Sequence, residues 1–173
     1  MPFATARRPR LSRLSLAFLM SLPLVLVAAP GADSAARECT RADISVRLRL
    51  DRFRYDRGEP VRMKMTVKNV SKLRCKMVWG DGNWGSLVVR RENGRRVWWD
   101  EGCAVYTQAI VEERWRRGHT ESYRGTWRQR TAGDPDTCEY DGRRARRGLY
   151  FARGIFEGAG NVRSNRVWFR LRA

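Results

Sequence analysis

Residues 61–69 read VRMKMTVKN, and this nine-residue stretch decides the fold. Its apolar side chains recur at every second position, with basic and polar side chains between them. Successive side chains of a β-strand point to opposite faces, so the stretch predicts a strand with one buried face and one charged, solvated face. The apolar positions are Val61, Met63, Met65 and Val67.

The same two-residue period recurs on both sides of this strand. Residues 44–50 alternate between apolar and polar side chains, and the phase then shifts near Asp51 and Arg52, which predicts a β-bulge. RGEP at 57–60 and ENG at 92–94 are turn signals between strands. Further strands are expected over residues 73–79, 87–91, 97–99, 105–113, 121–127, 149–157 and 165–171. No segment shows a sustained helical period, so the predicted fold class is all-β, an antiparallel β-sandwich of about eight strands.

The first 36 residues differ in composition from the rest of the chain. Arg7, Arg8, Arg10 and Arg13 precede an almost entirely apolar run at 14–29, and small residues follow. This order is typical of a secretory signal peptide, with cleavage after Ala36, and the run is too short for a good membrane span. We therefore predict a signal peptide at 1–36, one domain at 37–173, and a secreted or periplasmic location. The export route, general or twin-arginine, stays open.

Four cysteines lie far apart in residues 37–173. They form no C-x-x-C pair, and the single His119 cannot complete a zinc cluster with them. In an exported chain this pattern predicts two disulfides, for which three pairings are possible. Counting strand reversals places one pair of cysteines at each end of the sandwich. The expected disulfides are therefore Cys39–Cys75 and Cys103–Cys138.

The chain carries a formal net charge of +18, and its basic residues are mostly arginine. A charge of this size favours acidic partners, such as anionic lipid, a cell-envelope polymer, nucleic acid or an acidic protein. Nucleic acid is not expected, because export would separate the chain from most of it. GC-rich codon usage is the alternative explanation, because the arginines are scattered over every segment instead of forming one stripe.

The sequence lacks the elements of an active site. It contains no G-x-S-x-G motif, no Gly-rich phosphate loop and no histidine pair. His119 follows Gly118 at an expected hairpin tip, where a solvent-exposed histidine is the simplest interpretation. Four acids lie close together but lack the full spacing of a calcium loop and have arginines nearby: Asp134, Asp136, Glu139 and Asp141. We expect no enzyme activity, no metal site and no cofactor.

Four stretches, at 53–72, 92–110, 116–127 and 148–156, resemble the BsuPI-type intracellular proteinase inhibitor domain. The resemblance spans about residues 44–171. It implies an immunoglobulin-like β-sandwich that inhibits a serine proteinase of the subtilisin type. The positions that carry it are Gly58, Glu59 and Pro60 in a turn, Asn69 at a strand end, Val97, Trp98 and Asp100, Tyr106 and Gln108, Gly118, Trp127, and Gly148 and Tyr150.

The arginine-rich segment 128–148 is long for a connection in a compact domain, so it is either functional or loosely ordered. A substrate-like inhibitor holds an extended loop rigidly in a proteinase cleft, and a disulfide at Cys138 would brace this loop. Its contact candidates are Arg143, Arg144, Arg146 and Arg147. The alternative is a solvated charged loop that is itself easily cut.

Trp98 and Trp99 are adjacent in one expected strand, so they point to opposite faces and one of them is outside the core. Trp99 is the candidate for partner contact, because aromatic side chains anchor interfaces. Together these features predict a non-catalytic, monomeric, exported domain that binds a protein partner, a proteinase. The alternative is a cell-envelope-associated basic module that binds an anionic polymer or membrane surface.

Overall fold

The computed structural model describes residues 37–80, 84–100, 109–132 and 142–173. The chain divides after Ser34, and all described residues lie in the compact unit Ala35–Ala173. Residues 1–36, and with them the predicted signal peptide, lie outside the described residues. Within the described part, no helix has the length and apolar character that a membrane crossing requires.

The regular secondary structure of the described residues is almost entirely β-strand, which confirms the all-β prediction. Two single helical turns, η1 (Arg41–Asp43) and α1 (Gly158–Asn161), accompany them. The strands are β1 (Ile44–Leu50), β2 (Arg54–Tyr55), β3 (Val61–Asn69), β4 (Cys75–Gly80), β5 (Gly85–Arg91), β6 (Arg96–Trp99), β7 (Ile110–Trp115), β8 (Thr120–Trp127), β9 (Gly148–Phe156), β10 (Val162–Arg163) and β11 (Val167–Leu171).

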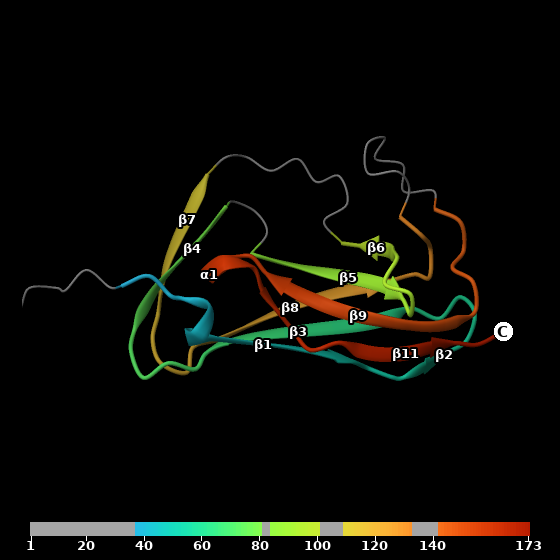
Figure 1. The fold of residues 1–173 in the computed structure, drawn as a ribbon, viewed down its shortest axis with the longest axis horizontal. Helices are drawn as coiled ribbons and strands as arrows, with labels where there is room; N and C mark the ends of the chain where they lie inside the picture. Colours follow the sequence, from blue (N-terminus) through green and yellow to red (C-terminus); the bar gives the residue numbers. More distant parts are fainter. Residues whose placement is uncertain (1–36, 81–83, 101–108, 133–141) are drawn as a thin grey trace, which may run out of the picture. The chain divides into compact units, whose positions relative to one another are not determined.

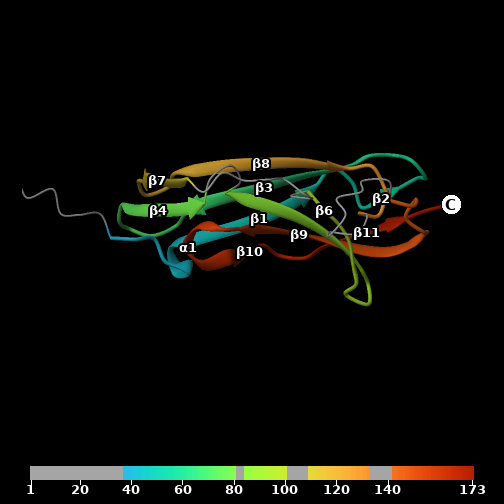
Figure 2. The same cartoon turned by 90° about the horizontal axis from the view of Figure 1, so that it is seen from above.

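The strands assemble into two layers and a separate ribbon (Figure 1). One layer is a three-stranded antiparallel sheet in the order β1-β3-β8. The other layer is a six-stranded sheet in the order β2-β11-β9-β5-β6, with β10 paired to β9 and β2 parallel to β11. Figure 2 shows β3 and β8 on one side of the sandwich and β9, β10 and β11 on the other. The ribbon β4-β7 lies at the end opposite the C-terminus (Figure 1).

The alternating side chains of residues 61–69 form one buried and one exposed face of β3, as predicted. Val61, Met63, Met65 and Val67 of β3 are each at most 3% exposed, whereas Arg62, Lys64 and Lys68 between them are exposed. Two glycines allow the two sheets to approach closely. A Cβ atom on Gly125 would lie 2.6 Å from Cδ1 of Leu87, and a Cβ on Gly154 would overlap Sδ of Met65.

The phase shift near residues 51 and 52 marks a change of sheet. The chain leaves β1 in the three-stranded sheet and enters β2, which pairs with β11 in the six-stranded sheet. Tyr55 is fully buried, and its hydroxyl donates to Oδ1 of Asp51 at 2.6 Å and accepts from the backbone N–H of Arg52 at 3.1 Å. Burial raises the pKa of Tyr55, so the hydroxyl stays protonated and available as a donor. A crossing between layers therefore replaces the predicted bulge.

Two strand boundaries differ from the prediction. The strand expected at 73–79 begins at Cys75, because residues 69–73 form a side-chain-bonded turn in which Leu73 is 58% exposed. The strand expected at 105–113 is described as β7, Ile110–Trp115, and residues 101–108 lie outside the described residues.

The N-terminal segment is tied to the ribbon by a disulfide between Cys39 and Cys75. A bidentate pair also holds it, because Arg37 donates to both carboxylate oxygens of Asp43 at 2.8 Å. The Arg37 guanidinium and the backbone N–H of Thr40 hold the pKa of Asp43 far below its ordinary value. The predicted Cys103–Cys138 disulfide lies outside the described residues.

Replacing Cys39 and Cys75 together by alanine should lower the free energy of unfolding by about 2–4 kcal/mol, because the bond restricts the unfolded chain. The bond joins residues 36 positions apart. Guanidinium unfolding of the full chain, wild type against the double variant, measures the difference. An unchanged unfolding midpoint would show that the Arg37–Asp43 pair and strand pairing hold this segment without the disulfide.

Candidate functional site

Residues 142–147, here called the basic segment, are held in an extended conformation beside residues 129–131. The backbone N–H of Ala145 donates to the carbonyl of Gln129 at 2.7 Å, and the N–H of Thr131 donates to the carbonyl of Arg143 at 2.8 Å. Arg130 and Arg144 form an isolated antiparallel bridge between these bonds. The backbone of the basic segment is therefore paired with residues 129–131, while residues 133–141 of the same arginine-rich segment lie outside the described residues.

Gln129 anchors this arrangement from inside. It is only 4% exposed and has a φ of 56°, in the left-handed region. Its side-chain amide donates to the carbonyls of Asp56 and Glu59 at 2.7 and 2.8 Å, and its carbonyl oxygen accepts from the N–H of Gly58 at 3.1 Å. A single side chain thus joins the β2–β3 turn to residues 129–131, which pair with the basic segment. Sequence reasoning missed Gln129, because its partners lie about seventy positions away.

The turn that Gln129 holds contains the Gly-Glu-Pro motif. Glu59 accepts a hydrogen bond from the N–H of Asp56 at 2.8 Å and one from the Arg52 guanidinium at 3.0 Å. These two donors, the backbone N–H first, lower the pKa of Glu59. The motif therefore builds a closed turn, which gives it a structural role.

Two buried aromatic residues hold this pair of backbone stretches, Trp127 at Arg130 and Tyr150 at Arg146. Trp127 is fully buried, and its indole N–H donates to the carbonyl of Arg130 at 2.6 Å. Tyr150 is also buried, and its hydroxyl donates to the carbonyl of Arg146. Both rings belong to the core cluster at this end of the sandwich. The basic segment is therefore attached to the core through its backbone, while its arginine side chains stay exposed.

A groove of about 480 Å³ separates the basic segment from the β5–β6 hairpin. Among the described residues its lining contains no acidic side chain and six arginines: Arg91, Arg95, Arg96, Arg143, Arg144 and Arg146. We call it the basic groove. The structure thus brings three of the four predicted contact arginines together with three from the hairpin, which the sequence did not connect with them. Arg147 lies instead beside Arg57 and Arg172, next to the C-terminus.

Trp98 and Trp99 point to opposite faces, as predicted from their adjacency. Trp98 pairs with Val89, which is fully buried, and packs against the core. Trp99 pairs with Val88 on the outer face of the six-stranded sheet, and the guanidinium carbon of Arg96 lies 4.0 Å from the centre of its ring. Trp99 does not line the basic groove, but it supports an arginine that does.

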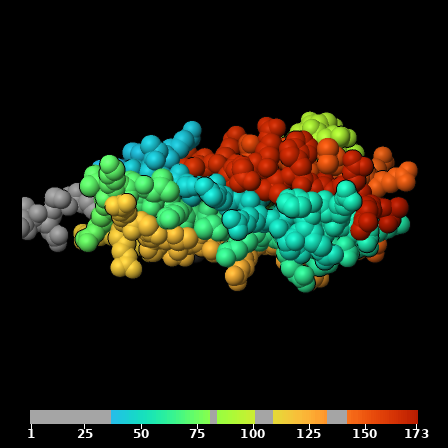
Figure 3. All heavy atoms as spheres, turned by 90° about the horizontal axis from the view of Figure 1, so that it is seen from below, coloured from blue at the N-terminus to red at the C-terminus, as the bar shows by residue number. Residues whose placement is uncertain are grey.

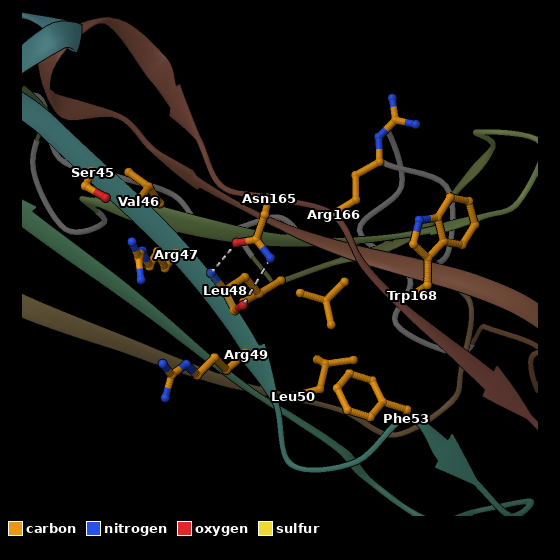
Figure 4. Close-up of a pocket in the computed structure, with 11 residues that line it drawn as sticks. Ser45, Val46, Arg47, Leu48, Arg49, Leu50, Phe53, Asn165, Arg166 and Trp168 are labelled. Atoms are coloured by element: carbon orange, nitrogen blue, oxygen red, sulfur yellow. Dashed lines mark hydrogen bonds between the residues drawn. The ribbon is translucent and has the colours of Figure 1, made fainter.

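A larger groove of about 890 Å³ lies between β1 and the start of β11 (Figure 4). The side chain of Asn165 spans it, accepting from the N–H of Leu48 at 3.1 Å and donating to its carbonyl at 3.5 Å. Asn165 thereby occupies the middle of the exposed edge of β1, a position where another strand would otherwise pair. The space-filling view of this side shows the C-terminal strands next to the region of residues 44–60 (Figure 3).

His119 lies in the β7–β8 turn, as expected, but its side chain is only 24% exposed. It packs against Trp115, with ring centres 4.7 Å apart, and its Nε2 is 3.0 Å from Oε1 of Glu121. Glu113 accepts from the Trp115 indole N–H at 3.0 Å. Glu113, His119 and Glu121 offer possible ligand atoms within 4.8 Å of one another, and each of these side chains also has a partner within the protein. The four acids considered for calcium, together with Tyr106 and Gln108, lie outside the described residues.

Several solved structures contain regions similar to this chain. A β-glucosidase from Erythrobacter marinus matches with 10% identity and a TM-score of 0.43, covering 75% of this chain and 15% of the enzyme. The DNA glycosylase AlkC from Pseudomonas fluorescens matches with 13% identity and a TM-score of 0.45, over 76% of this chain and 31% of that protein. The sporulation control protein Spo0M from Bacillus subtilis matches with 11% identity and a TM-score of 0.42, over 76% of this chain and 50% of Spo0M. This chain thus spans at most half the length of these proteins, and TM-scores below 0.5 carry no argument about its function. No curated protein matches the sequence.

The family model described as BsuPI, intracellular proteinase inhibitor, matches residues 48–157. The word intracellular contradicts the secreted or periplasmic location predicted from residues 1–36, and that prediction is wrong on this finding. It rested on the composition of residues 1–36, a stretch outside the described residues. Export was also the reason for excluding nucleic acid, so that reason no longer stands. Because the match covers well over half of the 173 residues and agrees with the β-sandwich, this chain belongs to the BsuPI family of intracellular proteinase inhibitor domains.

Proposed function

We propose that this chain inhibits a serine proteinase of the subtilisin type by presenting the basic segment to the proteinase cleft. The observation that carries the proposal is a backbone held by the core from behind while four arginine side chains point into solvent. The family supports inhibition of a proteinase.

The physical advantage of this arrangement is pre-organisation. A loop that is already extended loses little conformational entropy when a proteinase binds it, so more of the contact energy appears as affinity. Gln129, Trp127 and Tyr150 hold the basic segment before any partner arrives. Arginine side chains exposed on such a backbone suit a proteinase whose cleft prefers basic residues or carries an acidic surface.

The test is inhibition of subtilisin and of trypsin by the full chain, measured as an inhibition constant with a chromogenic substrate. Replacing the four arginines of the basic segment by alanine should weaken inhibition of the sensitive proteinase by about a hundredfold or more, the loss typical of removing a central contact cluster. The variant positions are Arg143, Arg144, Arg146 and Arg147.

The matched control removes four exposed arginines from the opposite end of the sandwich: Arg74, Arg114, Arg116 and Arg117. It has the same net charge as the first variant, so it should inhibit within about threefold of the wild type if contact, and not charge, matters. Equal weakening in both variants would reduce the role of the arginines to long-range attraction. Full inhibition by the first variant would show that the basic segment is not part of the interface. If the wild type inhibits neither proteinase, the proposal of a serine proteinase as the target is wrong.

Added salt separates this proposal from the alternative of an anionic polymer or membrane surface as the partner. Exposed charges are screened over about 8 Å at physiological ionic strength, so binding to a polyanion should fall steeply as salt increases. A packed proteinase interface of about 800 Å² per partner should persist. Two results together would favour the alternative: loss of inhibition at high salt, and binding of the chain to anionic vesicles at low salt.

A further inference from the structure

The outer face of the six-stranded sheet carries positive charge without any acid within its strands. The residues of β2, β5, β6, β9, β10 and β11 include seven arginines and neither Asp nor Glu. On β9, Phe151, Arg153 and Ile155 occupy this face, because Tyr150, Ala152 and Phe156 between and beside them point into the core. Like charges gathered on one face repel one another, so their collection needs a physical explanation.

Arg153 stands at the centre of this face. It pairs across the sheet with Val88, which places Arg90 on the diagonal of one neighbouring strand. It also lies on the diagonal from Arg163, because Arg163 pairs with Ile155. Diagonal positions in a sheet are within reach of side chains as long as arginine. Arg153 is therefore surrounded by arginines on both sides.

The guanidinium of Arg153 is only partly solvated and lacks a partner at its inner end. Its Nε atom is buried, and no acceptor in the described part of the protein lies within hydrogen-bond distance of it. Burial, and then the charges of Arg166, Arg163 and Arg90, lower the pKa of Arg153. A buried donor without an acceptor destabilises the folded protein, and more so when it is charged. An incoming anion would offset the repulsion among these four charges.

An aromatic ring and a backbone carbonyl hold two of the neighbouring guanidinium groups, because Arg166 lies over Phe151 and Arg90 donates to the carbonyl of Gly94 at 2.8 Å. The guanidinium carbon of Arg166 lies 5.0 Å from the centre of the Phe151 ring, and the Trp168 ring is 4.9 Å from Phe151. Trp168 is 41% exposed, so it borders the arginines with an open apolar surface. Arginines fixed in this way lose less conformational freedom when they bind, which favours a defined site over diffuse attraction.

We propose that Arg153, with Arg90, Arg163 and Arg166, forms a binding site for a doubly charged phosphoryl group on the outer face of the six-stranded sheet. A tetrahedral dianion has enough oxygens to accept from several guanidinium groups at once, and arginine matches phosphate geometry better than a point charge does. The register that sets Arg153 diagonally between Arg90 and Arg163 distinguishes this site from the exposed arginines elsewhere, and its terminal guanidinium nitrogens supply the donors. The site lies on strands β5, β9 and β10 and the β10–β11 connection, away from the basic segment, so it is independent of the proposed inhibition.

The experiment titrates the full chain with inorganic phosphate, against sodium chloride at equal ionic strength, and follows the arginine Nε–H resonances by NMR. We expect saturable shifts of a small set of these resonances in the wild type with phosphate only. R153M should weaken binding at least tenfold. R124M should bind like the wild type, because Arg124 is an exposed mid-strand arginine of the other sheet, paired with Lys64 and remote from Arg153. A second titration uses phenyl phosphate to distinguish two sources of the phosphoryl group. If the site binds phosphate esters, phenyl phosphate should bind more tightly than inorganic phosphate, because its ring can contact Trp168. Equal affinity of the two would identify the free ion as the ligand.

A stability measurement on the same proteins checks the premise that the Arg153 side chain lowers the free energy of unfolding. Without phosphate, R153M should unfold at the same or a higher midpoint than the wild type, because it removes a partly buried charge without a partner. R166M, which removes an exposed member of the cluster, provides the binding test if R153M does not fold. Equal affinity of the wild type and the cluster variants, or shifts that chloride reproduces, would overturn the proposal.

Discussion

Replacing Trp127 by alanine is expected to lower the free energy of unfolding by about 3–5 kcal/mol, the range for removing a large buried aromatic side chain. Trp127 is fully buried, with its ring 5.6 Å from that of Tyr150 and 6.1 Å from that of Phe169. The substitution leaves a cavity among these rings. It also removes the donor to the carbonyl of Arg130. Stability and the order of the basic segment should therefore decline together.

Chemical unfolding measures the stability loss, and limited proteolysis of the folded variant shows whether cleavage between residues 129 and 147 increases. Trp168→Ala is the control, because it deletes the same side chain from a position that is 41% exposed. We expect it to cost less than half as much. A loss for Trp127→Ala no larger than for Trp168→Ala would contradict the assignment of Trp127 as the central anchor of this end of the sandwich.

Replacing Asn69 by alanine should cost about 3 kcal/mol, because it removes hydrogen bonds from a buried site without filling it. Asn69 is fully buried at the end of β3. Its amide nitrogen donates to the carbonyl of Trp115 at 3.0 Å, and its oxygen accepts from the N–H and hydroxyl of Ser71 at 2.9 and 2.8 Å. One side chain thus joins the β3–β4 turn to the β7–β8 turn.

Asn93 offers the matched comparison. Its side chain accepts one hydrogen bond, from the N–H of Arg95 at 3.1 Å, in an exposed hairpin turn where water can replace it. Asn93→Ala should therefore change the free energy of unfolding by less than about 1 kcal/mol. Hydrogen exchange of the 69–73 and 116–119 backbone amides gives a second measurement. It should accelerate in Asn69→Ala at both turns, and acceleration at only one would show that the residue does not couple them.

Much of the fold was accessible from local pattern. The strand at 61–69, the strand at 44–50 and the hairpin at 92–94 follow from side-chain period and turn chemistry, which act between residues close together in the chain. The change of sheet after β1 was not accessible. It has the same sequence signature as a bulge, and only the pairing of β2 with β11 separates the two.

The candidate site was predicted only in part. Arg143, Arg144 and Arg146 were singled out because they interrupt the strand rhythm, and they line the basic groove. Their partners across the groove, Arg91, Arg95 and Arg96, carry no signal that connects them with residues some fifty positions later. Arg153 looks in the sequence like any outward arginine of an alternating strand. Its neighbours become visible only when the strand register is known.

Alternation of side chains was therefore sufficient to assign an all-β sandwich and its buried faces, because burial of one face of each strand is the main favourable contribution to folding and places apolar residues at every second position. The family came from the resemblance of the motif positions. Tertiary structure alone decided which arginines share a groove, which one lies among others without an acceptor, and how Gln129 holds a turn some seventy residues away. Such contacts depend on strand order and register. Both are set by the packing of the whole domain, and no short stretch of sequence records them.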